Sequence, residues 1–142
     1  MSPEELDAAA VDFTQAVGLF VRRIRAAAIH QELSMTESTV LARLDKQGPA
    51  TISDLARAEG MKPQSMGATI ATLEEQGLVR RTPHPTDGRQ MFIELTPAGL
   101  ELRQATRAAK RTWLVNALSQ LSPAEQEALF KAGELIRRMA RG

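Results

Sequence analysis

The segment 52–96 constrains the fold of this chain more than any other part of the sequence. It begins with two short amphipathic patterns that Gly60 separates, and the second pattern ends at Gly77. Two short runs with strand character follow, at 78–82 and 90–95, on either side of a loop rich in turn residues. Helix, turn, helix and hairpin in this order predict a helix-turn-helix with a β-hairpin wing, within a mainly α-helical protein.

Serine and threonine residues mark where the predicted helices begin. The side-chain oxygen of an N-cap residue accepts a bond from an N–H group that the first helical turn leaves free, and a glutamate three residues later can return the bond. The expected caps are Ser34 with Glu37, Thr51 with Asp54 favoured by the helix dipole, and Ser122 with Glu125, while Thr36 is an alternative to Ser34.

Three outer helices, one before and two after the winged-helix segment, bear apolar stripes of helical period. A winged helix of about 60 residues is too small to cover all of them. A homodimer whose N- and C-terminal helices interlock would bury them, and a helical bundle within one chain is the alternative. We therefore predict three regions in the chain: an N-terminal dimerisation helix (1–35), a winged helix-turn-helix domain (36–96) and C-terminal dimerisation helices (97–142). The predicted interface residues are Leu6, Phe13, Val17, Trp113, Leu121, Leu129 and Ile136.

The composition is that of an ordinary folded protein that lacks thiol chemistry. The chain has 142 residues, of which 43% are hydrophobic and 25% charged. The absence of cysteine excludes disulfides, zinc fingers and thiolate catalysis. No apolar run approaches the roughly 18 residues of a membrane span, and the N-terminus is acidic, unlike a signal peptide. We therefore expect a cytoplasmic protein with no membrane partner.

Catalytic and cofactor motifs are missing from the sequence. His30 and His84 are its two histidines. His30 is expected to end the first helix, where the helix dipole favours it, and His84 is expected at a loop tip between two prolines. No glycine-rich phosphate loop or metal-ligand spacing occurs. We expect no enzyme activity, no catalytic residue, no metal and no cofactor.

The segment 40–100 resembles the MarR family of bacterial and archaeal transcriptional regulators. The resemblance lies in LARAEGMKPQSMGATIATLEEQGLV and in TDGRQMFIELTPAG, which has the family's Asp-x-Arg wing and the Leu-Thr that closes the second strand. It implies an obligate homodimer that binds pseudo-palindromic, double-stranded promoter DNA, and often a small aromatic or anionic effector that releases the DNA. Because a dimer over a promoter blocks polymerase, repression is the expected outcome, with activation as the alternative.

The helix that starts at Pro63 is the expected reading helix. Met66, Ile70 and Leu73 share one face by their spacing and are expected to point inward. The opposite face is expected to reach base edges in the major groove, where glutamine can bond adenine twice and alanine can pack on a thymine methyl. A solvated polar face is the alternative. The residues assigned to DNA, with the first of them near phosphates, are Lys62, Gln64, Ser65, Ala68 and Thr72. The family often has arginine at the last two positions, so this helix is poor in positive charge.

The wing is expected to supply the missing cations. Asp87 and Arg89 lie two residues apart, so the carboxylate is predicted to orient the guanidinium, and arginine is favoured in narrow A·T-rich minor grooves. Strand alternation sends Arg80 and Arg81 to opposite faces, and we favour Arg81 as the one toward phosphate. A plain hairpin turn with a solvated arginine is the alternative.

The charge balance leaves room for a different function, a winged helix that binds protein and not DNA. Residues 40–95 carry seven basic and seven acidic side chains, so binding of a polyanion requires a local positive patch. The resemblance also implies an effector pocket between the helical dimer base and the reading domain. Its candidate lining residues, each of which is otherwise a plain core residue, are Phe20, Ile24, Met35 and Trp113.

Overall fold

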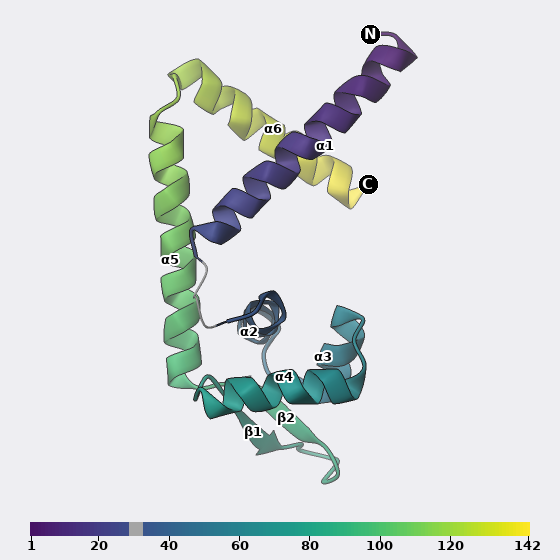
Figure 1. The fold of residues 1–142 in the computed structure, drawn as a ribbon, viewed down its shortest axis with the longest axis vertical. Helices are drawn as coiled ribbons and strands as arrows, with labels where there is room; N and C mark the ends of the chain where they lie inside the picture. The colour runs from purple at the N-terminus through teal and green to yellow at the C-terminus, as the bar shows by residue number, and fades with distance from the viewer. Residues whose placement is uncertain (29–32) are drawn as a thin grey trace. The chain divides into compact units, whose positions relative to one another are not determined.

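The computed structural model describes residues 1–28 and 33–142, which form a mainly helical protein with one small antiparallel sheet (Figure 1). Its elements are α1 (Pro3–Ala26), α2 (Met35–Gln47), α3 (Ile52–Glu59), α4 (Pro63–Glu75), β1 (Val79–Pro83), β2 (Met91–Leu95), α5 (Pro97–Ser119) and α6 (Pro123–Arg141). The predicted winged helix-turn-helix with additional terminal helices is confirmed. His30 lies outside the described residues. Within the described ranges, no helix combines the length and the apolar character that a membrane span requires.

The N-caps predicted from the sequence are formed. The Ser34 hydroxyl accepts the backbone N–H of Glu37 at 3.1 Å, and the Glu37 carboxylate accepts the N–H of Ser34 at 3.1 Å. Ser34 has the extended backbone that lets its side chain reach the first turn, whereas Thr36 lies inside α2, so the alternative cap is wrong. The same reciprocal pair joins Thr51 with Asp54 and Ser122 with Glu125.

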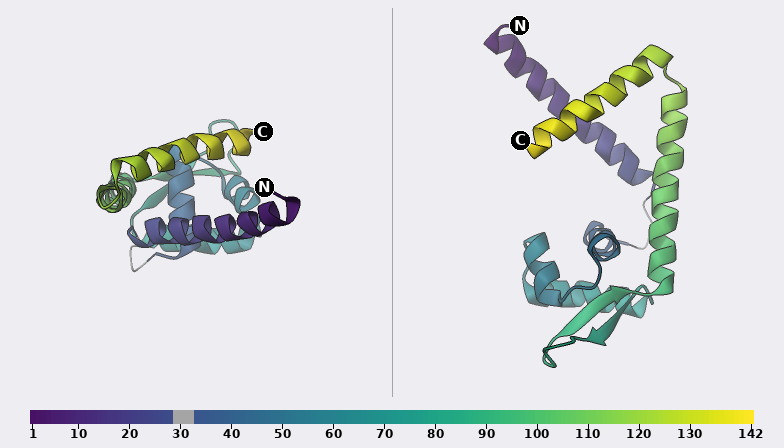
Figure 2. Two further views of the ribbon diagram at one scale, coloured as in Figure 1. Left: turned by 90° about the horizontal axis from the view of Figure 1, so that it is seen from above. Right: turned by 180° about the vertical axis from the view of Figure 1, so that it is seen from behind.

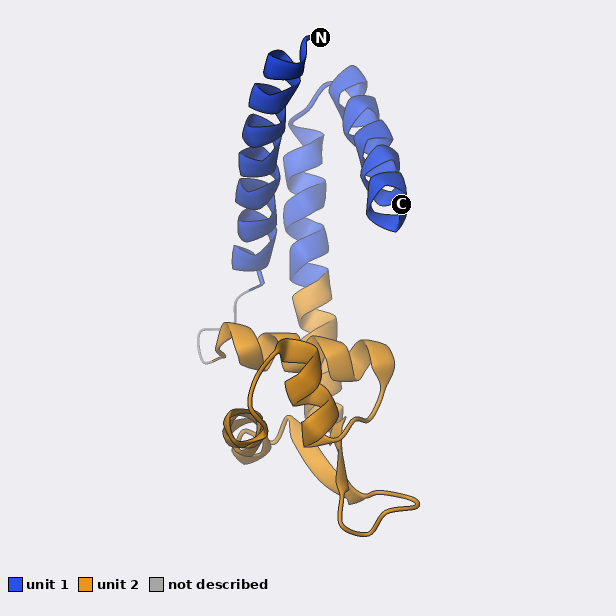
Figure 3. Cartoon of the chain, turned by 90° about the vertical axis from the view of Figure 1, so that its right-hand side faces the viewer, with its two compact units in different colours: residues 1–28, 108–142 blue, residues 29–107 orange. Residues whose placement is uncertain are grey.

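The chain divides into two compact units, and the unit of residues 29–107 contains the main hydrophobic core (Figure 3). Helices α2, α3 and α4 gather with the β1–β2 hairpin in this unit, as the right view of Figure 2 shows. The predicted inner face of α4 belongs to the core, which confirms the helical period read from the sequence. The core residues, all at most 4% exposed, are Val40, Leu41, Leu44, Leu55, Ala56, Met66, Ile70, Leu73, Val79 and Ile93.

A backbone bridge at Ala50 ties the hairpin to the helices. β1 and β2 pair antiparallel, with Val79 opposite Leu95. Ala50, in the link between α2 and α3, exchanges two backbone hydrogen bonds with Ile93 of β2, at 3.1 and 2.7 Å. The wing is therefore held beside the start of α3.

Both strands begin one residue later than the sequence predicted. The Leu78 N–H donates to the carbonyl of Leu73 at 3.0 Å, which closes the end of α4 after Gly77. Gly77 has φ of 74°, a left-handed conformation that glycine adopts without strain. Leu78 thus completes the helix cap, and the strand starts after it.

A close approach between α5 and the start of the hairpin requires glycine at position 99. The Thr96 hydroxyl donates to the carbonyl of Gly77 at 2.5 Å and accepts the N–H of Gly99 at 3.1 Å. A Cβ on Gly99 would lie 2.1 Å from the carbonyl oxygen of Leu78. The threonine and glycine of the TPAG sequence therefore fix the start of α5 against the end of α4.

The other unit, residues 1–28 and 108–142, leaves many of its large apolar side chains exposed. Neither α1 nor α6 contains a buried residue. The Phe20 and Trp113 rings lie 6.2 Å apart, and the Arg23 guanidinium lies 5.5 Å over the Trp113 ring. In the left view of Figure 2, α1 and α6 extend from the end-on α5 as two separate rods.

Candidate nucleic-acid interface

Helix α4 has one buried face and one exposed face. Met66, Ile70 and Leu73 are 0% exposed. The Thr72 hydroxyl donates to the carbonyl of Ala68 at 3.2 Å, so it faces solvent mainly as an acceptor. The structure brings the five residues assigned to DNA to the exposed side and the N-terminal end of this helix: Lys62, Gln64, Ser65, Ala68 and Thr72.

The N-terminus of α4 is open. Lys62 occupies the N-cap position, and no side chain in the described part of the chain forms a cap hydrogen bond there. Pro63 has no N–H group, which leaves the N–H groups of Gln64 and Ser65 as the first free donors. The positive end of the helix dipole is therefore available to a phosphate beside these residues.

The three arginines of the wing differ in their partners. Arg80 Nε donates to Glu94 Oε1 at 2.7 Å, across the hairpin. Arg81 Nε donates to Glu74 Oε1 of α4 at 3.2 Å. Arg89 is exposed, and no carboxylate among the described residues forms an ion pair with its guanidinium. Arg89 therefore presents its full charge to an incoming anion, whereas the charges of the two strand arginines are partly neutralised.

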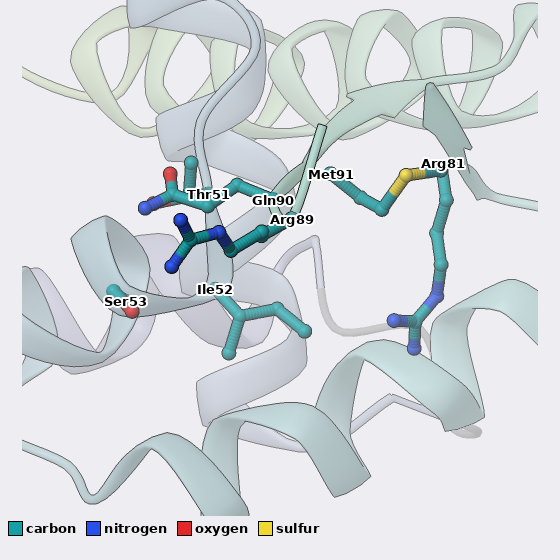
Figure 4. Close-up of a pocket in the computed structure, with 7 residues that line it drawn as sticks. All are labelled: Thr51, Ile52, Ser53, Arg81, Arg89, Gln90 and Met91. Carbon is teal, nitrogen blue, oxygen red and sulfur yellow. The ribbon is translucent and has the colours of Figure 1, made fainter. Parts of the chain in front are cut away.

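A shallow pocket of about 230 Å³ lies between the start of α3 and the wing (Figure 4). Its lining residues are Thr51, Ile52, Ser53, Arg81, Arg89, Gln90 and Met91. In Figure 4 the Arg89 side chain lies left of centre and that of Arg81 at the right, with Met91 between them and Ile52 below Arg89. Arg81 therefore shares this surface with Arg89, and Arg80 does not line it.

Sequence reasoning missed Ser53 and Gln90, which complete this pocket. They come together because the Ala50–Ile93 bridge sets β2 beside the start of α3, and no local pattern reveals that register. Guanidinium, amide and hydroxyl donors suit the pocket to an anion. Over the described ranges, no group of three or more His, Asp or Glu side chains is placed to hold a metal ion.

Asp87 shapes the turn of the wing and does not orient the guanidinium of Arg89. Its Oδ1 accepts the backbone N–H of Arg89 at 3.0 Å. Its carbonyl accepts the N–H of Gln90 at 3.1 Å. The predicted carboxylate–guanidinium contact is wrong, because a carboxylate two residues before a backbone N–H bonds that nearer group in an Asx turn.

His84 lies at the start of the wing loop and not at its tip, where it was predicted. Its Nδ1 accepts the backbone N–H groups of Thr86 and Asp87, at 3.2 and 3.1 Å. Its ring lies 4.6 Å from the ring of Phe92 on β2. The sequence signal for this role was the position of His84, whose ring can accept hydrogen bonds from N–H groups two and three residues later in a loop.

The residues predicted to form a dimer interface are all incompletely buried in the single chain. Leu6, Phe13 and Leu129 are 60%, 50% and 46% exposed. Val17 and Ile136 are also exposed, and Trp113 and Leu121 are half-buried.

The four candidate effector residues are brought together only in part. Phe20 contacts Trp113, as described above, and the half-buried Ile24 belongs to the same unit. Met35 is 59% exposed and belongs to the other unit. None of the four lines the pocket of Figure 4.

Several transcriptional regulators and solved structures match this chain over most of its length. The sequence model of the MarR family matches residues 33–91. An uncharacterized HTH-type transcriptional regulator of Mycobacterium leprae is 35% identical over 127 residues, which cover 89% of each chain. The crystal structure of RV1404 from Mycobacterium tuberculosis matches with a TM-score of 0.84 and 24% identity, covering 97% of this chain and 96% of that one. A variant of S. aureus MepR bound to an oligodeoxyribonucleotide matches with a TM-score of 0.71 and 20% identity, covering 94% and 96%.

Proposed function

Because this chain belongs to the MarR family of transcriptional regulators, we propose that it binds double-stranded promoter DNA as a homodimer and represses transcription there. Residues 36–96 bind one half-site of a pseudo-palindromic operator, and residues 1–35 and 97–142 hold the two copies together. In each half-site α4 enters the major groove and the wing enters the adjacent minor groove. The protein works in the cytoplasm, where bacterial promoters lie.

The proposal rests mainly on the observation that α4 has one buried face and one exposed polar face. Its inner face is fully buried, so the helix presents one fixed set of side chains to a ligand. Gln64 and Ser65 stand near its open N-terminus, the end that meets base edges in helix-turn-helix complexes. Gln64 can bond both N6 and N7 of adenine, and Ala68 can pack on a thymine methyl. The match to a MepR variant bound to DNA supports this use of the fold.

Positive charge in the interface is sparse and comes chiefly from the wing. Arg89 has no carboxylate partner among the described residues, and it suits the negative potential of a narrow minor groove. Arg81 shares the pocket surface with Arg89 and reaches phosphate when it leaves Glu74. Because α4 contributes few cations, shape and apolar contact contribute more of the discrimination than phosphate binding does.

The exposed apolar helices support the homodimer. Phe13 of α1 and Leu129 of α6 are about half exposed, in helices that contain no buried residue. Fully burying a side chain of this size stabilises an interface by about 1.5–3 kcal/mol, so a second copy has several such residues to cover. A two-fold dimer also presents two reading helices to half-sites about 34 Å apart, one turn of DNA.

Repression follows from the position of such a dimer, because a protein that covers a promoter excludes polymerase. A small aromatic or anionic effector relieves repression by favouring a dimer in which the two α4 helices no longer match the half-site spacing. The contacting rings of Phe20 and Trp113 are the first candidates to bind an aromatic effector.

A gel-shift titration with the DNA upstream of its own gene, repeated across a salt series, tests the proposal. We expect an affinity that falls steeply with salt, as phosphate contacts require. Arg89→Ala is expected to weaken binding at least about tenfold while the dimer persists, because a charged contact in a groove is lost. Arg141→Ala removes the same charge from an exposed position on α6 and is expected to have no effect.

Two outcomes would contradict the proposal. A winged helix that binds protein would show no salt-dependent affinity for DNA. Unchanged binding by Arg89→Ala at fixed salt would remove the wing from the interface. Gln64→Ala gives a finer test, because it is expected to relax the preference at one base pair and leave the salt dependence unchanged.

A further inference from the structure

The imidazole of His84 is the centre of the hydrogen bonds that order the wing loop. One atom, Nδ1, accepts the N–H of Thr86 at 3.2 Å and the N–H of Asp87 at 3.1 Å. The Thr86 hydroxyl lies 3.4 Å from the same atom. Because a backbone N–H can only donate, Nδ1 carries no proton, and the ring is the tautomer with hydrogen on Nε2.

A chain of hydrogen bonds connects His84 to Arg89 through Asp87. His84 fixes the N–H of Asp87, and the Asp87 carboxylate fixes the N–H of Arg89 at 3.0 Å. Two further backbone bonds close the loop, from Gln90 N–H to the Asp87 carbonyl at 3.1 Å and from His84 N–H to the Gln90 carbonyl at 3.3 Å. The backbone position of Arg89 therefore depends on His84.

The imidazole ring of His84 also packs against the sheet, through the ring of Phe92. Its ring centroid lies 4.6 Å from that of Phe92, with an interplanar angle of 36°. Phe92 lies on β2 and pairs with Thr82 of β1, so it belongs to the regular part of the hairpin. Contact with Phe92 fixes the orientation of the ring, and therefore the direction of the Nδ1 lone pair. The N–H groups of Thr86 and Asp87 bond to that lone pair, so the ring also fixes the backbone of the loop.

We propose that His84 is a positioning residue for DNA recognition, which fixes the backbone of Arg89 through Asp87 and so presents this arginine to the minor groove. This inference rests on the proposed function, in which Arg89 binds DNA. A loop that is ordered before binding loses less conformational freedom when it binds, so the affinity for DNA is higher. His84 itself contacts no DNA in this arrangement and acts through Arg89.

Two substitutions distinguish the contribution of the Phe92 contact from that of the Nδ1 hydrogen bonds. His84→Phe keeps an aromatic ring beside Phe92 and removes the acceptor, whereas His84→Asn keeps an acceptor oxygen near Nδ1 and removes the ring. We expect His84→Phe to weaken operator binding about tenfold and His84→Asn to stay within about threefold of the unmodified protein. In an Arg89→Ala background His84→Phe is expected to have no further effect, because the residue acts through Arg89.

The test uses the full-length dimer, with operator affinity measured at fixed salt and thermal unfolding measured for each variant. Nitrogen-15 spectra of the two histidines are expected to show the Nε2–H tautomer for His84. Normal binding by His84→Phe, equal losses in His84→Phe and His84→Asn, or a further loss in the Arg89→Ala background would each overturn the inference. Normal binding by Arg89→Ala alone would instead overturn the wing assignment of the proposed function.

Discussion

Among the described residues, every buried apolar side chain lies in the unit of residues 29–107, whereas the unit of residues 1–28 and 108–142 leaves many of its large apolar side chains exposed (the units are those of Figure 3). Leu55 of α3 is 0% exposed, and Phe13 of α1 is 50% exposed. Both units contain amphipathic helices with capped starts, such as α3 in one and α1 and α6 in the other. The difference therefore lies in whether the chain itself supplies an apolar surface for those helices to pack against.

This difference predicts two kinds of stability. The unit of residues 29–107 closes its core with its own hairpin, so its stability does not depend on protein concentration. The unit of residues 1–28 and 108–142 has apolar faces that a second copy would cover, so its stability should rise with concentration.

Gly99→Ala is expected to have the largest effect, because its new side chain would collide with backbone in the unit of residues 29–107. The new Cβ would lie 2.1 Å from the Leu78 carbonyl oxygen, and neither backbone can move without breaking the Thr96 bonds. We expect the free energy of unfolding to fall by about 3 kcal/mol or more, measured by urea unfolding. Gly67→Ala, in α4 with nothing within 4 Å, is the matched control and should be neutral or stabilising by up to about 1 kcal/mol. Equal stability of the two variants would contradict the tight packing at Gly99.

Leu129→Glu acts on the other unit and should dissociate the proposed dimer. Covering a new carboxylate with a partner helix weakens association by about 2 kcal/mol or more, while residues 29–107 keep their core. Sedimentation equilibrium over a range of concentrations measures the mass, and circular dichroism measures the remaining fold. Lys131→Glu adds the same side chain at a polar, exposed position of α6 and should leave the mass unchanged. A dimer that persists in Leu129→Glu would exclude Leu129 from the interface, and an unmodified protein that sediments as a monomer would favour the single-chain bundle.

Glu74→Gln tests the ion pair of Arg81 in the unit of residues 29–107 and leaves the other unit unchanged. The Glu74 carboxylate holds Arg81 at 3.2 Å, so its loss frees a cation on the pocket surface. We expect affinity to rise about two- to fivefold for operator and unrelated DNA alike, in the range of a partly exposed ion pair. The gain should vanish when Arg81→Ala is also present. If the gain survives in the double variant, the loss of the negative charge at position 74, and not the release of Arg81, is responsible. Glu75→Gln, which removes a neighbouring carboxylate, is the control.

The smallest effect concerns the cap of α6. Hydrogen bonds from the Ser122 backbone and side chain hold the pKa of Glu125 below its ordinary value of 4.5. Because the folded pKa is the lower one, the cap stabilises the protein above pH 4.5 and this contribution is lost as pH falls through the folded pKa. Ser122→Ala should therefore unfold at a lower temperature than the unmodified protein near pH 7, with a gap that narrows toward pH 3. A gap that stays constant with pH would contradict the role of the carboxylate.

The helix boundaries could be predicted because the interactions that set them are local. Ser34 and Glu37 are three residues apart, and their reciprocal bonds need no other part of the chain. Gly60 ends α3 with φ of 64°, which its lack of a side chain allows. The buried face of α4 followed from its helical period in the same way.

The wing could be predicted only in outline. The Asp87-Gly88-Arg89 sequence indicated a hairpin turn, but the partner of the Asp87 carboxylate was wrong. Several donors lie within reach of one acceptor in a loop, and the backbone path decides which of them it meets. His84 was missed for the same reason, since its acceptor role depends on a ring position that Phe92 fixes from the next strand.

By itself the sequence determined the order of helices and strands, the caps that start them and the exposed face of α4, because these depend on residues within one or two helical turns. Only the tertiary structure decided that Arg81 pairs with Glu74, that Ser53 and Gln90 meet at the wing, and that residue 99 must be glycine. Each of these depends on two segments that are brought together by the Ala50–Ile93 bridge or by the turn after α4. Their contacts arise from the packing of distant segments, which a local pattern does not encode.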